Sequence, residues 1–384
     1  MLKYLFLLKT KQLRKLYELF CLLPKNLKVQ CIKLKCRQNQ RWLKQLILPK
    51  RIIWFVTSRC PGKCDFCLFK KYRNNQIEMP VEAFEKIVKS FKHQLTSVTL
   101  TGGEAFVRDD FVDLCRILDN YNKSLIVSIP TGGFNPEKIE AALKAILQTT
   151  KFSLRVHVSL DGIGNFHDEL RGYPGLFASA VETIKRCKDL HKKFFRFQQL
   201  TVLTTISAAN AEELQDLIHF VKNDLGVFQK FQFIRNTQTD VFGCDNFFRS
   251  DLDCRTIFRP NNMLDIINLL ETELRKLNTS LEAMIERIIL QLIGEIISKK
   301  KKILSCVAGC YEGVIFPDGS VSICEFTRPF ANLYNYDFNF LDLWRSPDKK
   351  KLLDQLRNCF CTHPCHLLSA LMFDENVLMR LAAS

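Results

Sequence analysis

Three cysteines lie close together in the stretch TSRCPGKCDFCLF, which covers residues 57–69. They are Cys60, Cys64 and Cys67, and no fourth cysteine stands beside them. A disulfide uses two thiols, and a closed tetrahedral zinc site uses four ligands. A [4Fe–4S] cluster is usually held by four thiolates, so three cysteines leave one iron open to another ligand. The spacing favours such a cluster. Zinc completed by a distant ligand and three unrelated thiols are the alternatives.

The same loop resembles the signature of the radical S-adenosylmethionine (SAM) superfamily, C-x3-C-x-aromatic-C, in which Phe66 is the aromatic residue. In that family the open iron chelates the amino and carboxylate groups of SAM. Reduction of the cluster cleaves SAM to methionine and a 5′-deoxyadenosyl radical, which abstracts hydrogen from the substrate. The resemblance therefore implies an enzyme that binds a [4Fe–4S] cluster and SAM and needs a one-electron reductant such as flavodoxin or ferredoxin.

Further SAM contacts are implied by the resemblance. The family's G-G-E turn is matched in TGGEAFVR, where a carboxylate would face the methionyl ammonium and glycines would let the backbone approach the ligand. The stretch SLDGIGNFHDELRG is similar to the region after the family's fourth strand. There Ser159 and Asp161 would face the SAM ribose, and Arg171 would reach the SAM carboxylate. The alternatives are that Asp161 and Gly162 form a plain turn and that Arg171 is a surface charge. The residues that the resemblance implies as SAM contacts are Phe66, Gly102, Gly103, Glu104, Ser159, Asp161 and Arg171.

A second group of cysteines lies near the end of the chain. The segment SCVAGCYEGVIFPDGSVSICE followed by NCFCTHPCH resembles the SPASM/twitch extension of radical SAM enzymes, which holds auxiliary clusters. A hairpin at FPDGSV is also expected from its turn residues. The six cysteines of this group are enough for one auxiliary [4Fe–4S] cluster. A zinc site built from the same thiols is the alternative. The resemblance assigns Cys306, Cys324, Cys361 and Cys365, with Cys359 and Cys310 as alternates and with His363 and His366 as possible hydrogen-bond donors beside them.

The elements that position these residues follow from periodicity. Apolar β-rich runs alternate with amphipathic helical segments, which predicts right-handed βαβ units and a parallel sheet. Because the chemically interesting residues stand at the ends of strands, we expect an α/β fold: a partial (β/α)6 TIM-like barrel followed by a small cysteine-rich domain. The expected strands are 51–57, 97–104, 124–133, 152–162, 198–207 and 227–235, and the expected helices are 81–94, 109–122, 136–148, 175–193 and 211–225.

Five segments are expected along the chain. They are a basic helical extension (1–50), the radical SAM core (51–250), a helical connection (251–303), the SPASM/twitch domain (304–366) and a tail (367–384). The resemblance covers about residues 51–366.

Charge is concentrated in the first segment. The chain carries a net charge of +16, and residues 1–50 hold 13 Lys and Arg against one acid, which is +12 of that total. A basic amphipathic helix, with Leu13, Leu16, Tyr17 and Phe20 on one face, can lie on an anionic membrane surface or pack on the body with its basic face in water. Export and specific nucleic-acid binding are not expected. The clusters imply a reducing cytoplasm, with inner-membrane contact as an alternative.

The reaction is expected to be oxidative. The single auxiliary cluster resembles that of the radical SAM dehydrogenases of aminoglycoside synthesis, which implies dehydrogenation of a small alcohol or amine. The alternatives are a maturase that crosslinks or epimerises a ribosomal peptide, and a non-catalytic iron–sulfur scaffold or sensor. Substrate contacts are expected from residues after the sixth strand, namely Arg235, Asn236 and Gln238. No catalytic acid or base is assigned.

Overall fold

The computed structural model describes residues 24–64, 66–70, 73–75, 77–234, 241–242, 260–277, 281–355 and 358–383. These residues form two compact units. The barrel unit contains the described residues of 47–242 and 308–358, and the helical unit contains those of 24–46, 260–307 and 359–383. We describe each unit separately.

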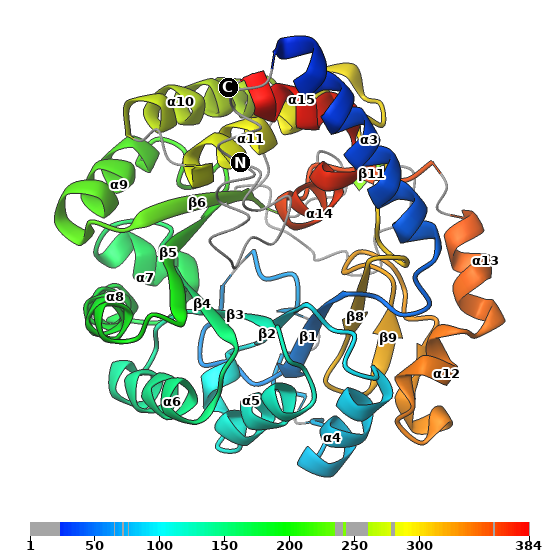
Figure 1. Cartoon of the computed structure of the whole chain (residues 1–384). Coiled ribbons are helices and arrows are strands. Elements are labelled where there is room, and N and C mark those ends of the chain that lie inside the picture. Colours follow the sequence, from blue (N-terminus) through cyan, green and yellow to red (C-terminus); the bar gives the residue numbers. More distant parts are fainter. Residues whose placement is uncertain are drawn as a thin grey trace. The chain divides into compact units, whose positions relative to one another are not determined.

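The barrel unit is built on a curved parallel sheet with helices on its outer face (Figure 1). Each of the strands β1 to β5 pairs in parallel with the next along the chain, which confirms the predicted partial barrel. The strands are β1 (Arg51–Thr57), β2 (Ser97–Gly102), β3 (Ile126–Thr131), β4 (Ser153–Ser159), β5 (Phe197–Ile206) and β6 (Phe228–Phe233), and a short β7 spans Val241–Phe242.

The expected crossover helices are present, although several are shorter than predicted. They are α4 (Val81–Ser90), α5 (Phe111–Asn120), α6 (Pro136–Thr149), α8 (Leu176–Lys193) and α9 (Leu214–Phe220), the last continued by a π-helical turn over Val221–Leu225. Sequence periodicity missed two short elements, α7 (Asn165–Arg171) and the 3₁₀ turn η2 (Ala105–Val107). They lie in the segments that follow β2 and β4; Glu104 caps η2, and Arg171 is the last residue of α7.

The two faces of the barrel wall differ, because successive side chains of a strand point to opposite sides. On the outer side of β1, Ile52, Trp54 and Val56 are buried, and Trp54 stacks on Phe84 of α4 with ring centroids 4.1 Å apart. The inner side is more polar, as shown by His157 of β4, whose Nδ1 lies 2.6 Å from the hydroxyl of Thr201 on β5. The apolar core therefore lies between strands and helices, and the interior keeps groups that can bind a ligand.

The predicted hairpin near residue 318 is confirmed, and it extends the barrel sheet. Strand β8 (Glu312–Ile315) pairs antiparallel with β9 (Ser320–Ser322), and it also pairs in parallel with β1. Gly319 has φ +80°, a left-handed conformation that suits glycine at this turn. An ion pair between Arg51 and the buried Glu312 joins β1 to β8. The unit also contains β10 (Ala331–Asn332), η5 (Leu333–Tyr336), α12 (Phe340–Trp344) and α13 (Pro347–Gln355).

The helical unit contains the basic helix α3. Two side chains of α3 bind the carbonyl oxygen of Phe373, the Cys36 thiol at 3.2 Å and the Gln40 amide at 2.9 Å. Arg37 and Arg41 remain exposed, so this helix packs within its unit and keeps basic side chains in water. The elements are α3 (Lys25–Lys44), α10 (Pro260–Leu277), α11 (Leu281–Lys299), β11 (Phe360–Cys361), α14 (Pro364–Ala370), η6 (Leu371–Phe373) and α15 (Glu375–Ala383).

The residues that carry the predicted apolar face at 13–20 lie outside the described part of the chain. Among the described helices, none combines the length and the apolar character that crossing a membrane requires.

Candidate active site and auxiliary cysteines

The three-cysteine loop begins directly after β1, at the carboxyl edge of the parallel sheet, where barrels of this kind place their active sites. Cys60, Cys64 and Cys67 are all partly exposed. The backbone N–H of Cys60 donates to Oδ1 of Asn74 at 2.9 Å, and that of Cys67 donates to the carbonyl oxygen of Cys64 at 3.3 Å. These bonds fix the backbone of a loop that has no regular secondary structure of its own.

The electrostatics of the loop fit a bound metal cluster. Burial, with a smaller effect of the nearby carboxylate of Glu104, raises the pKa of Cys60 to about 12. Burial also raises the pKa of Cys64, against the opposing effect of Arg171. Thiols with raised pKa values stay protonated at neutral pH unless a cation compensates the thiolate charge, and coordinated iron supplies that charge. Three thiols on one loop therefore suit an iron–sulfur cluster.

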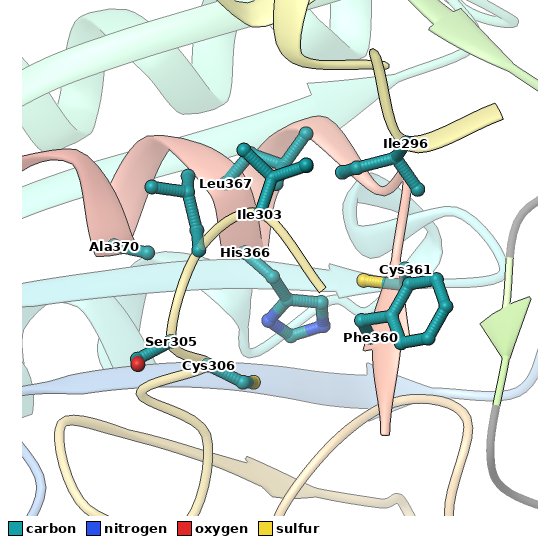
Figure 2. Close-up of a pocket in the computed structure, with 10 residues that line it drawn as sticks. Ile296, Ile303, Ser305, Cys306, Phe360, Cys361, His366, Leu367 and Ala370 are labelled. Carbon is teal, nitrogen blue, oxygen red and sulfur yellow. The ribbon is translucent and has the colours of Figure 1, made fainter. Parts of the chain in front are cut away.

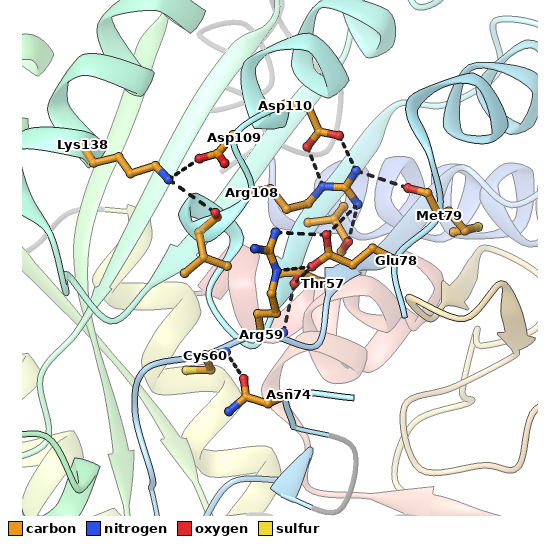
Figure 3. A network of polar contacts seen from close by, with 12 residues as sticks. Thr57, Arg59, Cys60, Asn74, Glu78, Met79, Arg108, Asp109, Asp110 and Lys138 are labelled. Carbon is orange, nitrogen blue, oxygen red and sulfur yellow. Dashed lines mark hydrogen bonds and ion pairs between the residues drawn. The ribbon is translucent and has the colours of Figure 1, made fainter. Parts of the chain in front are cut away.

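A polar network supports the start of the loop (Figure 3). The carboxylate of Glu78 accepts hydrogen bonds from Nε of Arg59 at 2.7 Å, from Nη2 of the same residue at 3.1 Å, and from the hydroxyl of Thr57. The buried Arg108 donates Nη1 to the carbonyl oxygen of Val56 at 2.7 Å and lies 4.0 Å from Glu78. Because Arg59 immediately precedes Cys60, this network sets where the first ligand leaves the strand.

The glycine turn after β2 lies against the cysteine loop. The N–H of Gly103 donates to the carbonyl oxygen of Thr57 at 3.0 Å, and that of Glu104 donates to the carbonyl oxygen of Arg59 at 2.8 Å. A Cβ atom at Gly103 would lie 2.2 Å from that Arg59 oxygen and 2.8 Å from Cβ of Cys60. No larger residue fits there without displacing the loop.

Glu104 is buried and fully engaged. Its carboxylate accepts from the Thr131 hydroxyl at 2.9 Å, from the N–H of Gly132 at 2.7 Å and from the N–H of Phe106 at 3.3 Å. Burial raises its pKa, and these hydrogen bonds oppose the rise. In this structure Glu104 ties the turn after β2 to the end of β3. Its contact with a SAM ammonium stays a prediction.

Asp161 and Arg171 form an ion pair beside the cysteine loop. Nε of Arg171 donates to Oδ2 of Asp161 at 2.6 Å, and the N–H of Thr205 donates to Oδ1 at 2.7 Å. The Asp161 side chain is completely buried, whereas the Arg171 side chain keeps 12% of its surface exposed and its Cζ lies 5.3 Å from the ring centre of Phe66. In this structure the Asp161 carboxylate therefore orients Arg171. The predicted ribose contact of Asp161 stays a prediction. Ser159, at the end of β4, is half-buried.

A neutral histidine completes this region. Nδ1 of His167, on α7, accepts the backbone N–H of Asp161 at 3.0 Å, which places the ring proton on Nε2. Burial lowers its pKa to about 4. His167 therefore shapes the loop after β4.

The auxiliary cysteines are divided between the two units. Cys306, Cys359, Cys361 and Cys365 belong to the helical unit, and Cys310 and Cys324 to the barrel unit. In the helical unit, Cys306 and Cys361 line one pocket together with His366 (Figure 2). In the barrel unit, Sγ of Cys324 accepts the N–H of Phe326 at 3.5 Å. Their assignment as cluster ligands stays a prediction.

Some predicted contacts cannot be placed, and others were missed. The predicted substrate residues Arg235, Asn236 and Gln238 lie outside the described part of the chain. Sequence reasoning missed Asn74 and Glu78, since neither stands in a recognisable motif. An arginine directly before the first cysteine was a usable signal, because a partly buried arginine needs an acidic partner.

Comparison with known proteins agrees with this geometry. Residues 54–221 match the model of the radical SAM superfamily. The sporulation killing factor maturation protein SkfB of Bacillus subtilis (strain 168) is 27% identical over 169 residues, which are 44% of this chain and 38% of SkfB. The antilisterial bacteriocin subtilosin biosynthesis protein AlbA of the same strain is 26% identical over 319 residues, which are 82% of this chain and 64% of AlbA. The chain thus spans less than two thirds of both curated relatives.

The fold is shared with a solved structure as well. The crystal structure of Streptococcus suis SuiB bound to the precursor peptide SuiA superposes with a TM-score of 0.57 at 15% identity, covering 83% of this chain and 70% of SuiB. Proteins of the matched superfamily use a [4Fe–4S] cluster and SAM, and the cysteine-rich C-terminal region here agrees with an auxiliary cluster domain. Residues 54–221, which carry the three-cysteine loop at the edge of the partial barrel, form a radical SAM domain.

Proposed function

We propose that this protein is a radical SAM enzyme that matures a precursor peptide. The observation that carries the proposal is the similarity to AlbA over 82% of this chain, because it runs through the barrel and into the cysteine-rich region. SkfB is likewise named as a maturation protein, and SuiB binds a precursor peptide on the same fold. These relatives support the peptide alternative better than dehydrogenation of a small alcohol or amine, which the auxiliary cysteines alone had favoured.

In this proposal Cys60, Cys64 and Cys67 hold a [4Fe–4S] cluster with one open iron. When bound, the cluster and SAM supply a 5′-deoxyadenosyl radical that removes hydrogen from the substrate. The protein's own task is to fix the loop and to keep water away. Asn74 and Glu78 serve the first purpose, because they bind the loop backbone and the side chain that precedes it.

The SAM carboxylate has one well-placed partner in the proposal. Arg171 lies beside the cysteine loop with a small part of its side chain exposed, and the direction of its guanidinium is set by the buried Asp161. A planar guanidinium binds a carboxylate with two parallel hydrogen bonds, which fixes orientation as well as position. Phe66, 5.3 Å from the guanidinium, adds an apolar surface on the loop itself.

The interior of the barrel suits a peptide. Inward-facing side chains on β4, β5 and β6 include His157, Thr205 and Gln232, and Nε2 of Gln232 donates to the Thr205 hydroxyl at 2.9 Å. Burial and nearby cations lower the pKa of His157, so its ring is neutral at pH 7. A peptide backbone offers one donor and one acceptor at most residues, and neutral polar side chains can pair with both.

The test uses the full chain reconstituted with iron and sulfide without oxygen, with SAM and a chemical reductant. We expect 5′-deoxyadenosine to form. Synthetic peptides encoded by short reading frames next to this gene serve as substrate probes, read out by loss of hydrogen mass or by deuterium exchange at a Cα. An alcohol and an amine of the aminoglycoside type serve as comparison substrates. Modification of a probe peptide alone supports the proposal, and modification of the small molecule alone refutes it.

The matched control is Cys64→Ala against Cys115→Ala. Cys115 is a buried cysteine on α5, remote in sequence from the loop, so its loss changes packing only. We expect Cys64→Ala to abolish 5′-deoxyadenosine formation and Cys115→Ala to retain it. Formation of 5′-deoxyadenosine by Cys64→Ala would refute the assignment, and absence of SAM binding in the wild type would favour a non-catalytic iron–sulfur protein.

A further inference from the structure

One pocket of the helical unit combines an apolar wall with three side chains of the types that serve as metal ligands in proteins. Cys306 and Cys361 contribute thiols and His366 contributes an imidazole. The apolar part of the wall comes from Ile296, Ile303, Leu304, Phe360, Leu367 and Ala370. Soft and borderline donors beside an apolar wall form an arrangement that can hold zinc or an iron–sulfur cluster.

The three donors come from separate parts of the helical unit. Cys306 stands in the segment after α11, Cys361 in β11, and His366 in α14. Figure 2 shows the imidazole of His366 directed into the same space as the sulfur atoms of Cys306 and Cys361. His366 is only 3% exposed, so its ring nitrogens face protein groups rather than bulk water. A buried imidazole in this company is a metal-ligand candidate.

Helix geometry separates His366 from its neighbour Cys365. Consecutive residues of an α-helix point about 100° apart, so Cys365 and His366 leave α14 in different directions. His366 lines the pocket, whereas Cys365 is not among the residues that line it. The residue that α14 presents to the two thiols is therefore the histidine, although the sequence had predicted the cysteine.

We propose that His366 supplies a nitrogen ligand to the auxiliary [4Fe–4S] cluster, beside the thiolates of Cys306 and Cys361. The inference rests on the auxiliary cluster that belongs to the proposed function. It replaces Cys365 in the predicted ligand set and leaves the fourth position to another cysteine. A neutral imidazole in place of an anionic thiolate makes the cluster less negative, and reduction then occurs at a higher potential.

The test reads the ligand directly by pulsed electron paramagnetic resonance. The full chain with Cys60, Cys64 and Cys67 all changed to Ala is reconstituted and reduced, so that only the auxiliary cluster contributes. We expect about four irons per chain, as one cubane requires. The spectrum should show strong coupling to a nitrogen nucleus. Growth on ¹⁵N-labelled histidine should change that coupling without any mutation at the site.

The histidine is then identified by matched variants in the same background. His363→Ala is the control, because its ring centre lies 5.1 Å from that of His366 while His363 does not line the pocket. We expect the coupling to survive in His363→Ala and to vanish in His366→Cys, which keeps a ligand and therefore keeps the iron. The reduction potential of His366→Cys should shift downward.

Three results overturn the inference: no histidine coupling in the labelled protein, a coupling that persists in His366→Cys, or zinc in place of iron. Formation of 5′-deoxyadenosine by the chain with Cys60, Cys64 and Cys67 intact is measured separately. If it occurs while the histidine coupling is absent, the ligand assignment fails and the proposed function stands. If 5′-deoxyadenosine does not form while the histidine coupling is present, the proposed function fails and the ligand assignment stands.

Discussion

Arg171 donates its Nε–H to the buried carboxylate of Asp161 at 2.6 Å, and its own carbonyl oxygen accepts the N–H of Lys63, in the cysteine loop, at 2.8 Å. One arginine therefore links the end of β4 to the three-cysteine loop through its side chain and through its backbone. The next residue, Gly172, has φ +58°, and a Cβ atom there would lie 2.8 Å from Cβ of Lys63. The close approach of two loops that are distant in sequence depends on this glycine.

Asp161→Asn tests the ion pair. The amide can still accept the N–H of Thr205, but it removes the charge that partners a mostly buried guanidinium. Breaking a buried pair in this way is expected to lower the free energy of unfolding by about 3 kcal/mol. We also expect weaker SAM binding, since Arg171 loses its fixed direction. Urea denaturation and equilibrium dialysis of SAM are the measurements.

The control for that change is Asp113→Asn. Asp113 is exposed on α5 and pairs with Arg116 at 2.7 Å, so its loss should change the free energy of unfolding by less than about 1 kcal/mol. If the two variants unfold at the same urea concentration and bind SAM alike, Asp161 does not orient Arg171.

Local patterns predicted the barrel well and the contacts within the site less well. The strand from Arg51 to Thr57 is a continuous β-rich run, because both of its faces are covered, and the helix from Pro136 begins at a clear cap, Asn135. The parallel pairing of β8 with β1 was not predicted, since it joins residues more than 250 positions apart and no local signal encodes such a register. Hydrophobic periodicity and helix caps are local features of the sequence, whereas the pairing of strands depends on the whole fold.

The same reason explains why the ion pair between Asp161 and Arg171 was not predicted. The short helix α7, which ends at Arg171, brings the two side chains together. A helix of seven residues carries too few apolar positions for periodicity to reveal it. Glu78 was missed for a related reason, because its partners Thr57 and Arg59 precede it by about twenty residues in an irregular segment.

Gly103→Ala tests the close approach of the glycine turn to the cysteine loop. The added methyl would overlap the carbonyl oxygen of Arg59 and contact Cys60, so the loop must shift. Overpacking of this kind costs about 1–3 kcal/mol. We expect that loss of stability together with reduced iron content at the SAM-binding site, measured by thermal unfolding and iron analysis.

Gly294→Ala is the matched glycine variant. A Cβ atom at Gly294, within α11, would have its nearest heavy atom 3.8 Å away, and alanine favours a helix over glycine by about 0.5–1 kcal/mol. This variant should be at least as stable as the wild type and should keep its iron. Equal iron content in the two variants would show that the turn tolerates a side chain.

His167 should make stability depend on pH. Burial lowers its pKa from 6.5 to about 4, so the unfolded chain binds a proton that the folded chain refuses. Its contribution to stability is complete above about pH 6.5 and is lost as the pH falls towards 4, with a total of about 3 kcal/mol. Urea unfolding of the cluster-free protein at pH 7 and at pH 5 measures the loss.

His167→Asn isolates this contribution from the other histidines. The asparagine oxygen can replace Nδ1 as acceptor for the N–H of Asp161 and does not titrate. The variant should be less stable than the wild type at pH 7 because it leaves a cavity, yet it should lose less stability between pH 7 and pH 5. Parallel losses in the two proteins would mean that His167 titrates normally in the folded state.

Glu78→Gln tests the network that holds the start of the cysteine loop. The carboxylate accepts from Arg59 and Thr57, and a neutral amide can accept only at its oxygen, so at least one donor loses its partner (Figure 3). We expect a loss of about 1–3 kcal/mol in the free energy of unfolding. Faster release of iron to a chelator should accompany it, because Arg59 directly precedes Cys60.

Glu182→Gln provides the comparison for this last change. Glu182 accepts Nε of Arg186 at 2.7 Å on the exposed side of α8, so its substitution removes a similar contact outside the loop. Iron release should then match the wild type. If Glu78→Gln also releases iron at the wild-type rate while its unfolding free energy falls, the network stabilises the barrel unit but does not fix the cluster loop, and the positioning role of Glu78 would be lost.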